Sequence, residues 1–337
     1  MLALASARVS LVSIVSLASL APFALAACAG TPAADAPAGG AEAAGTLHTF
    51  TSDAAGFDTH SFYYDTGREV IVFDAQFTEA HARKLIDDVR AHTASAITYV
   101  VITHPNPDKF QGVGPFRELG AKVVASRATG DAVPGVYAYK KGYFTTVAKT
   151  FTAETYPPPP VIDVTFSGSY TLPLQGGATV ELRELAHGGV STTQTVAVLP
   201  SLQALVVGDL VHHRAHAWLE GGIRAGKPDP DLGAWRAALD ELAVGFAGST
   251  VYGGRGEPAL VETAVADEKA YLERAEAIVR EYVTSLGPRK AELQGEKAAE
   301  HHKELARRIA SAFPEYALPY LIEYGVYGLA GEIAAGG

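Results

Sequence analysis

The chain has 337 residues, of which 48% are hydrophobic, 19% charged and 9% aromatic. This composition is typical of a globular protein and excludes a disordered, collagen-like or coiled-coil chain. The length allows about two domains, or one layered α/β unit made of two similar halves. With 37 acidic against 27 basic residues and a formal charge of −10, the chain lacks the positive balance of a nucleic-acid surface, so we exclude nucleic acid as a partner.

The N-terminal residues predict export. Arg8 is the single charge of the first 27 residues, and an apolar stretch with interspersed Ser and Pro follows it, from 9 to 25. This pattern is typical of a signal peptide. A transmembrane anchor needs about 20 strongly apolar residues, and a buried core helix has no reason to stand at the N-terminus.

The apolar stretch ends in Leu25-Ala26-Ala27-Cys28, which contains the only cysteine of the chain. This sequence resembles the bacterial lipobox, and the resemblance implies cleavage after residue 27 and lipidation of Cys28. Residues 28–46 are rich in Ala, Gly and Pro and predict a flexible tether. We therefore expect an exported lipoprotein of the bacterial cell envelope, bound to the membrane through its lipid. Ala29 after the cysteine resembles the outer-membrane pattern, with the protein on the periplasmic face if the host is Gram-negative.

From residue 47 onward, short strands alternate with helices. Alternating or continuous apolar runs bounded by turn residues predict strands over 48–51, 61–64, 69–74, 97–103, 122–125, 161–166, 179–185, 195–199, 202–207 and 250–252. Helical spacing of apolar residues predicts a helix between Thr78, its cap, and Thr93. Further helices are predicted over 230–243, 258–282 and 290–313, and the apolar tail 316–333 is expected to pack on the body.

Residues 126–160 differ from the rest because they are rich in Gly and Tyr and end in four prolines. Two interpretations remain open. The segment is either a lid or wall beside a site, or a surface excursion closed by a polyproline II spacer.

The strand predicted over 97–103 runs directly into His104-Pro105-Asn106-Pro107-Asp108-Lys109. Loops that leave the ends of buried strands often carry function. This loop resembles the His-x-His-x-Asp-His loop of the metallo-β-lactamase superfamily. The same resemblance extends, in order and spacing, to Phe73-Asp74, His187-Gly188-Gly189, Val207-Gly208-Asp209 and Gly254-Arg255-Gly256.

The resemblance implies an α/β fold of the αββα sandwich type over residues 47–285. Residues 286–337 then form a C-terminal helical extension packed on that domain. It also implies metal ligands at His104, Asn106, His187 and Asp209. However, Asn106, Lys109 and Arg255 stand where histidines are expected. An amide oxygen is a weak zinc ligand, and protonated Lys or Arg offers no lone pair. We therefore expect at most one zinc ion per chain.

The two cations replace ligands of the second metal. Two carboxylates left 4 Å apart without a metal repel each other by roughly 4 kcal/mol at an effective dielectric of about 20. We predict that Lys109 and Arg255 occupy that space and pair with Asp108 and Asp209. The alternative is a decayed site in which both cations point to solvent.

Three histidines after Asp209 also have two interpretations. His212, His213 and His216 either line the pocket as proton carriers or serve packing and the surface. We name His216 as the first candidate among them. The sequence has no Gly-x-Ser-x-Gly elbow and no phosphate-binding loop, which disfavours serine-hydrolase and nucleotide chemistry.

Two functions from different classes follow. In the first, a one-zinc hydrolase, the ion on His104, His187 and Asp209 activates a water that Asp108 orients toward an ester, lactone or amide carbonyl. Lys109 or Arg255 steadies the oxyanion. In the second, the protein is a lipid-anchored, metal-free binding or scaffold protein that keeps the fold and its pocket. Both hypotheses expect a small-molecule substrate or ligand.

Overall fold

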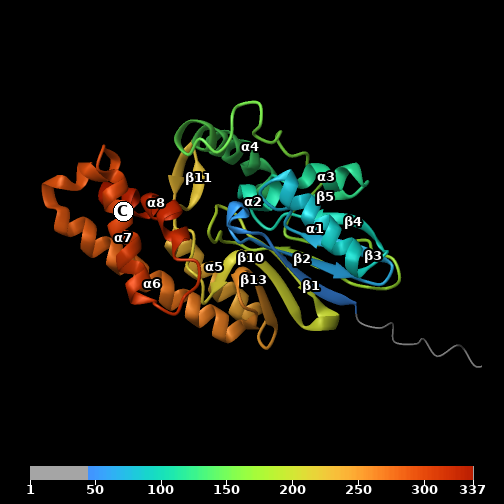
Figure 1. Cartoon of the computed structure of the whole chain (residues 1–337). Coiled ribbons are helices and arrows are strands. Elements are labelled where there is room, and N and C mark those ends of the chain that lie inside the picture. The colour runs from blue at the N-terminus through green and yellow to red at the C-terminus, as the bar shows by residue number, and fades with distance from the viewer. Residues whose placement is uncertain (1–44, 337) are drawn as a thin grey trace, which may run out of the picture. The chain divides into compact units, whose positions relative to one another are not determined.

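Two six-stranded sheets lie face to face in this computed structural model, which describes residues 45–336 (Figure 1). The predicted signal peptide, Cys28 and nearly all of the tether lie outside the described residues. The first sheet has the strand order β1-β2-β3-β4-β5-β6 and is parallel from β3 to β6. Its strands are β1 (Thr46–Thr51), β2 (His60–Asp65), β3 (Glu69–Phe73), β4 (Ala96–Val101), β5 (Lys122–Ser126) and β6 (Val164–Phe166).

The second sheet has the order β14-β13-β10-β9-β8-β7, and its β10 and β13 are parallel. Its strands are β7 (Ser169–Thr171), β8 (Glu181–Glu184), β9 (Thr195–Leu199), β10 (Ala204–His213), β13 (Thr250–Gly256) and β14 (Ala259–Leu260). A separate hairpin is formed by β11 (Gly222–Arg224) and β12 (Lys227–Asp229).

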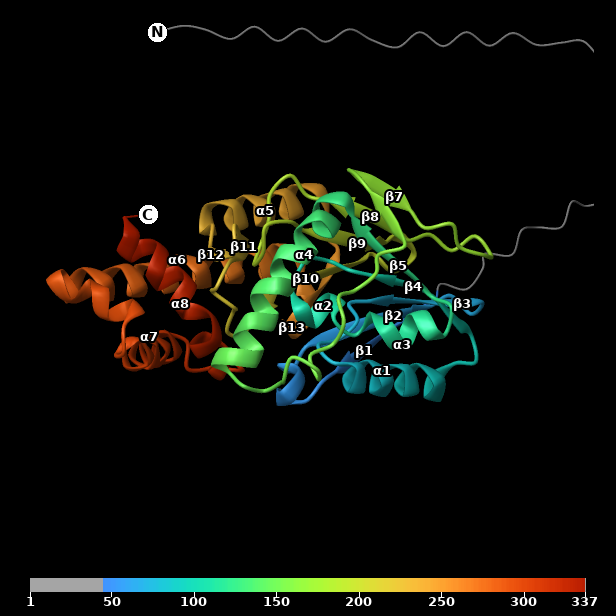
Figure 2. The ribbon, with the colours of Figure 1, turned by 90° about the horizontal axis from the view of Figure 1, so that it is seen from above.

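Helices cover both outer faces of the pair of sheets (Figure 2). They are α1 (Glu79–His92), α2 (Pro107–Phe110), α3 (Val113–Glu118), α4 (Arg127–Gly142), α5 (Leu232–Gly245), α6 (Val261–Leu286), α7 (Ala298–Ala312) and α8 (Tyr320–Ala335). Short 3-10 segments are η1 (Ala54–Gly56), η3 (Pro200–Leu202) and η4 (Gly287–Gln294), and η2 (Tyr143–Val147) is a π-helical turn.

The continuous apolar run of β3 shows why the layers form. Successive side chains of a strand point to opposite faces of its sheet. Val70 and Val72 accordingly pack in the core under α1 and α3, whereas Ile71 and Phe73 pack in the core between the two sheets. A third core joins the outer face of the second sheet to α5 and α6. The predicted αββα sandwich is therefore confirmed.

Residues 126–160 are largely helical, although no helix was predicted there. Helix α4 carries glycines and has Pro134 in its interior, which weakens a local helix signal. The helix persists because Val133 and Val136 are buried in the core of the first sheet and Ser126 caps it by accepting from the amide of Thr129. Tertiary packing outweighs local propensity at this segment.

The extra C-terminal helices are present and pack on the second sheet's side (Figure 1). Leu293 of η4, Leu305 of α7 and Ile322 of α8 join the same core as Trp235 of α5. The predicted helix over 290–313 is divided between η4 and α7. In the part of the chain that the structure describes, every helix is too short or too polar to cross a membrane.

Candidate functional site

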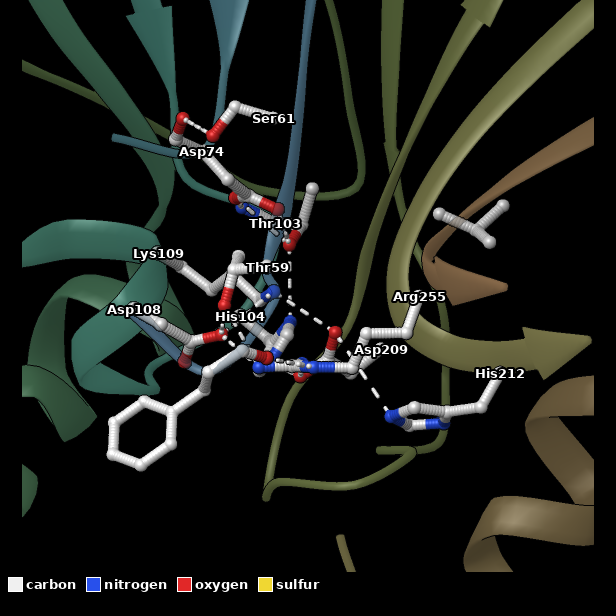
Figure 3. Close-up of polar contacts among 12 residues, drawn as sticks. Thr59, Ser61, Asp74, Thr103, His104, Asp108, Lys109, Asp209, His212 and Arg255 are labelled. Atoms are coloured by element: carbon white, nitrogen blue, oxygen red, sulfur yellow. Dashed lines mark hydrogen bonds and ion pairs between the residues drawn. The ribbon is translucent and has the colours of Figure 1, made fainter. Parts of the chain in front are cut away.

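Four charged side chains from both sheets meet at one end of the sandwich (Figure 3). Asp108 and Lys109 come from the short helix α2, which follows β4. Asp209 lies within β10 and Arg255 within β13, two neighbouring parallel strands of the second sheet. We call these four residues the ion cluster. Parallel strands end at the same edge of a sheet, so the fold itself brings their loops together.

The ion cluster joins each cation to both carboxylates. Lys109 Nζ lies 2.9 Å from Asp108 Oδ2 and 2.8 Å from Asp209 Oδ1. Arg255 places one guanidinium nitrogen 3.0 Å from Asp108 Oδ2 and another 2.6 Å from Asp209 Oδ2. All four side chains are at most 10% exposed. The pairing predicted from the sequence is thus present, and the alternative of cations pointing to solvent is not.

Each member of the ion cluster is charged because of the others. Burial by itself would raise the pKa of Asp209, but Arg255 and Lys109 outweigh burial and hold that pKa well below its usual range. The same two cations lower the pKa of Asp108 against the effect of burial. Asp108 and Asp209 in turn raise the pKa of Lys109 despite its burial. The cluster therefore contains two positive and two negative charges and is neutral as a whole.

Arg255 also fixes the loop before β2. Its Nε donates to the carbonyl of Phe57 at 3.1 Å and its Nη2 to Thr59 Oγ1 at 2.8 Å. Thr59 Oγ1 lies 3.0 Å from Asp108 Oδ2. Phe57 has a left-handed backbone with φ of 64°, which is unusual for a bulky residue and is tolerated only where surrounding contacts determine it. The cluster thus holds the backbone of Phe57 in place.

A chain of buried hydrogen bonds leads from Asp74 to His104. Asp74 accepts from the amide and hydroxyl of Thr103 at 2.9–3.0 Å, and Thr103 Oγ1 lies 3.0 Å from His104 Nδ1. When Asp74 is ionised, its carboxylate accepts the hydroxyl proton of Thr103, and Thr103 Oγ1 then accepts from Nδ1 of His104, which leaves Nε2 without a proton. Burial lowers the pKa of His104 to about 4 and raises the pKa of Asp74 to about 7.

Two imidazoles approach Asp209 without bonding to it. Nε2 of His104 lies 3.8 Å from Asp209 Oδ2, and Nε2 of His212 lies 4.0 Å from Asp209 Oδ1. Neither Nε2 atom has a partner among residues 45–336. Residues three apart on a regular strand face opposite ways, but the pairing of β10 with β13 shifts register between Gly208 and His212. That irregularity brings His212 toward the cluster, and the sequence pattern did not indicate it.

Two predicted residues lie elsewhere. The half-exposed ring of His187 contacts the carboxylate of Glu241 on α5. His216, the first candidate among the later histidines, directs Nδ1 at the hydroxyl of Tyr271 on α6 and stands beside Tyr316. Isolated histidines in a glycine-rich loop or after a strand do not reveal which way the backbone turns them.

The donor set does not fit the zinc ion that the sequence resemblance implied. Zinc in proteins takes about four Cys, His or carboxylate ligands, and no group of three or more such side chains within residues 45–336 is arranged to hold a metal. Both oxygens of Asp209 face positive nitrogens at 2.6–2.8 Å. Gly254 packs directly against Asp209, because a Cβ at position 254 would lie 1.8 Å from Asp209 Oδ1. The ion cluster thus takes up the carboxylates that a metal would need.

A narrow pocket with a cavity volume of about 20 Å³ opens above the ion cluster. Its lining combines the charged floor with four aromatic rings and with residues at the start of α2. The lining residues are Phe57, Phe77, Asn106, Pro107, Asp108, Lys140, Phe144, Asp209, Trp218 and Arg255. Lys140 and Phe144 come from α4 and η2. Of the two interpretations of 126–160, the wall beside a site describes this part of the segment.

Comparisons with known proteins agree with this architecture. A model described as the metallo-beta-lactamase superfamily matches residues 54–244, more than half of the chain. No curated protein matches the sequence.

Solved structures with the same arrangement include a metallo-beta-lactamase from Erythrobacter litoralis, solved with beta mercaptoethanol in its active site. It is 17% identical, with 68% of this chain and 92% of that chain covered and a TM-score of 0.50. A metallo-beta-lactamase from Pontibacter korlensis is 20% identical over 67% of this chain and 94% of its own, with a TM-score of 0.49. FIM-1 from Pseudomonas aeruginosa, in its mono-zinc form, is 17% identical over 68% and 90%, with a TM-score of 0.49. The Erythrobacter likeness shows the fold.

Removing one cation from the ion cluster should destabilise the protein strongly. In Arg255→Met, buried carboxylates lose a partner, which costs about 3 to 5 kcal/mol of unfolding free energy. The matched control is Arg224→Met, because Arg224 pairs with Asp229 on the surface hairpin with side chains 73% and 41% exposed; its loss should stay below about 1 kcal/mol. Urea unfolding measures both. Equal, small losses would show that burial adds nothing to the Arg255 pairs.

Stability should also fall as the pH drops from about 6.5 to 4.5. Burial lowers the pKa of His60, His104 and His216 to about 4. In the unfolded chain these histidines bind a proton near the usual pKa of about 6.5, so between these two pKa values the unfolded chain binds three protons that the folded chain does not bind. Asp74, with its raised pKa, offsets one of them. Each uncompensated proton contributes a slope of about 1.4 kcal/mol per pH unit.

Urea unfolding at several pH values measures this slope, and His216→Gln should make it shallower by one proton. A stability that stays flat or rises toward pH 4.5 contradicts the assignment.

Proposed function

The chain belongs to the metallo-beta-lactamase superfamily, and we propose that within it the protein binds a small molecule at a centre that works without a metal ion. One observation carries the proposal. Lys109 and Arg255 lie between Asp108 and Asp209, buried and within 3.0 Å of both carboxylates. The charges that a divalent cation would supply to these carboxylates are supplied by the protein itself.

Electrostatics support a metal-free centre. At an effective dielectric of about 20, two unit charges 4 Å apart interact by about 4 kcal/mol. A divalent ion added beside Asp209 would meet two fixed cations and would find both carboxylate oxygens already accepting charge-assisted hydrogen bonds. Because the four charges compensate one another, the ion cluster is neutral without a further cation.

The pocket supports binding rather than metal-activated hydrolysis. Its aromatic walls are preformed by ring contacts that do not require a ligand, such as Phe57 with Phe77 at 5.0 Å between centroids. Binding sites for small molecules combine such apolar walls with a few placed polar groups. Asp108 and Asn106 supply those groups at the floor. The ion cluster then serves as a rigid, neutral base for the pocket.

The alternative is a one-zinc hydrolase of an ester, lactone or amide. The unpartnered Nε2 atoms of His104 and His212 beside Asp209 favour it. Two requirements argue against the hydrolase: the zinc ion would need at least one further ligand, and Asp209 would have to release one of its two cations. Zinc content distinguishes the two functions directly.

We expect the purified full chain, handled without chelators, to contain no stoichiometric zinc and to show no zinc-dependent rise in melting temperature. Lys109→His plus Arg255→His should be destabilised and should gain such a rise, because imidazoles replace the cations between the carboxylates and a bound ion adds RT ln(1 + [L]/Kd) to stability. Elemental analysis and thermal melts measure both. One zinc per parent chain would support the hydrolase, and two would contradict both functions.

We further propose that the protein is exported and anchored by a lipid on Cys28, with the membrane as its second partner. The proposal is supported by the apolar N-terminal stretch that ends in Leu25-Ala26-Ala27-Cys28 and by the absence of any other cysteine from the sequence. A single acyl chain binds a protein to a membrane only weakly, whereas two or more acyl chains on one residue anchor it stably.

Cys28→Ser should abolish labelling by a radioactive fatty acid and leave the precursor uncleaved, because only a thiol forms the thioether to diacylglycerol. Gel mobility and label incorporation in a bacterial host measure the result. Ser19→Ala, inside the apolar stretch, is the control and should change neither. Normal cleavage of Cys28→Ser to a soluble product contradicts the lipid anchor.

A further inference from the structure

We infer that a second cleft, built largely by the C-terminal extension, binds a zwitterion of the amino-acid class with an apolar side chain. The cleft lies between α4, the β11–β12 hairpin and the helical segments η4, α7 and α8 (Figure 2). Its cavity volume is about 520 Å³, within the range of about 300 to 1,000 Å³ that is usual for small-molecule sites. It shares no lining residue with the pocket above the ion cluster, so the inference goes beyond the proposed function.

Much of the lining of this cleft is apolar or aromatic. Leu293 of η4 is 3% exposed and belongs to the core that α7 and α8 share with the second sheet. The hydroxyls of Tyr139 on α4 and Tyr327 on α8 lie 3.1 Å apart, and Tyr327 donates to Glu220. Because both hydroxyls bond within the protein, the two tyrosines offer ring surface to a ligand. Ring surface favours an apolar or aromatic side chain.

Two opposite charges at the cleft have no partner in the protein. Lys227 begins β12, Glu332 lies near the end of α8, and both side chains are exposed. Neither makes an ion pair or a side-chain hydrogen bond within the part of the chain that the structure describes. A singly charged ligand would pair with one of them and be repelled by the other. A molecule with one carboxylate and one ammonium group gives each a partner.

His302 of α7 adds a polar group to the wall beside Tyr327, with the two ring centroids 6.1 Å apart. Its Nε2 is buried and has no hydrogen-bond partner among residues 45–336. Burial lowers the pKa of His302, so the imidazole is uncharged at neutral pH and adds no third charge to the cleft. An unpaired buried polar atom is unfavourable, and a ligand group that reached Nε2 would relieve this.

A glycine on α8 keeps the cleft open. Gly328 is needed for packing, because a Cβ there would lie 2.2 Å from the carbonyl oxygen of Glu220. One turn later, the nearest heavy atom to a Cβ at Gly331 would be Gln294 Nε2, at 3.9 Å. Glycine inside a helix is less favourable than alanine, and no packing contact requires it at position 331. Space for a ligand explains its presence, and a larger side chain there would fill the cleft.

Three probes that share a phenyl ring test the inference. They are L-phenylalanine, 3-phenylpropionate, which lacks the ammonium group, and 2-phenylethylammonium, which lacks the carboxylate. We expect L-phenylalanine to bind the purified full chain at least threefold more tightly than either analogue, the gain that an ion pair at a partly exposed site can supply. Ligand-observed NMR titration measures the three affinities, and added salt should reduce the differences between them.

Substitutions then assign each charge. Lys227→Ala should weaken L-phenylalanine at least threefold without weakening 2-phenylethylammonium, and Glu332→Ala should weaken it equally without weakening 3-phenylpropionate. Lys303→Ala and Glu323→Ala are the matched controls and should change no affinity, because both residues are exposed on α7 and α8 and lie outside the lining.

Gly331→Leu tests the place of the ligand. It should weaken all three probes at least tenfold without lowering the melting temperature, because the leucine side chain enters open space. A lowered melting temperature would contradict the assignment of Gly331 to a ligand rather than to packing.

Equal affinities of the three probes overturn the zwitterion, and no binding of any probe overturns the site. Tight binding of L-phenylalanine to Gly331→Leu places the ligand elsewhere and overturns the cleft. None of these outcomes depends on metal at the ion cluster. Zinc content therefore tests the proposed function separately.

Discussion

The pairing of two buried cations with two buried carboxylates is the interaction on which the rest of the site depends. This pairing connects the two sheets. Lys109, which follows a strand of the first sheet, bonds to Asp209 of the second sheet, and Arg255 of the second sheet bonds to Asp108. A bridging metal would tie the same two loops together through its ligands. Here direct ion pairs do so, and they also seat Phe57 and Thr59 against the cluster.

Buried ion pairs are poor evidence of stability on their own, because desolvation can cancel their attraction. Their effect at this position is geometric. Each carboxylate meets both cations, so a shift of one sheet end relative to the other would break several contacts at once. Gly254 enforces the close approach, since no larger residue leaves room for Asp209. The cluster thus fixes the relative position of loops that come from distant parts of the sequence.

The C-terminal extension gives the common fold its individual pocket. The superfamily model matches residues 54–244, which hold most strands of the sandwich. Within that range, Trp218 and Glu220 are held by side chains of α8. Helix α4 supplies the opposite wall through Lys140 and Phe144. Both elements border a floor that the ion cluster keeps neutral. Fold alone does not assign a reaction, and in this protein the departures from the family's residues carry more information about function than the agreements.

Much of the architecture could be predicted from the sequence because it depends on local patterns. The continuous apolar run of β3 required burial on both faces, and Thr78 marked the start of α1 by capping it. The resemblance of the motifs to the metallo-β-lactamase superfamily implied the sandwich and the positions of Asp108, Lys109, Asp209 and Arg255. Charge alone indicated their pairing, since buried carboxylates without a metal need cations.

Tertiary structure decided what depends on contacts between distant segments. Helix α4 forms despite its glycines and Pro134, because Val133 and Val136 find a core to fill. His187 turns toward Glu241, and a register shift in β10 brings His212 to Asp209 instead. A sequence specifies which residues are apolar, charged or able to cap a helix. Which way an isolated side chain points is set by the backbone around it, and that backbone is fixed only when the two sheets and their helices pack.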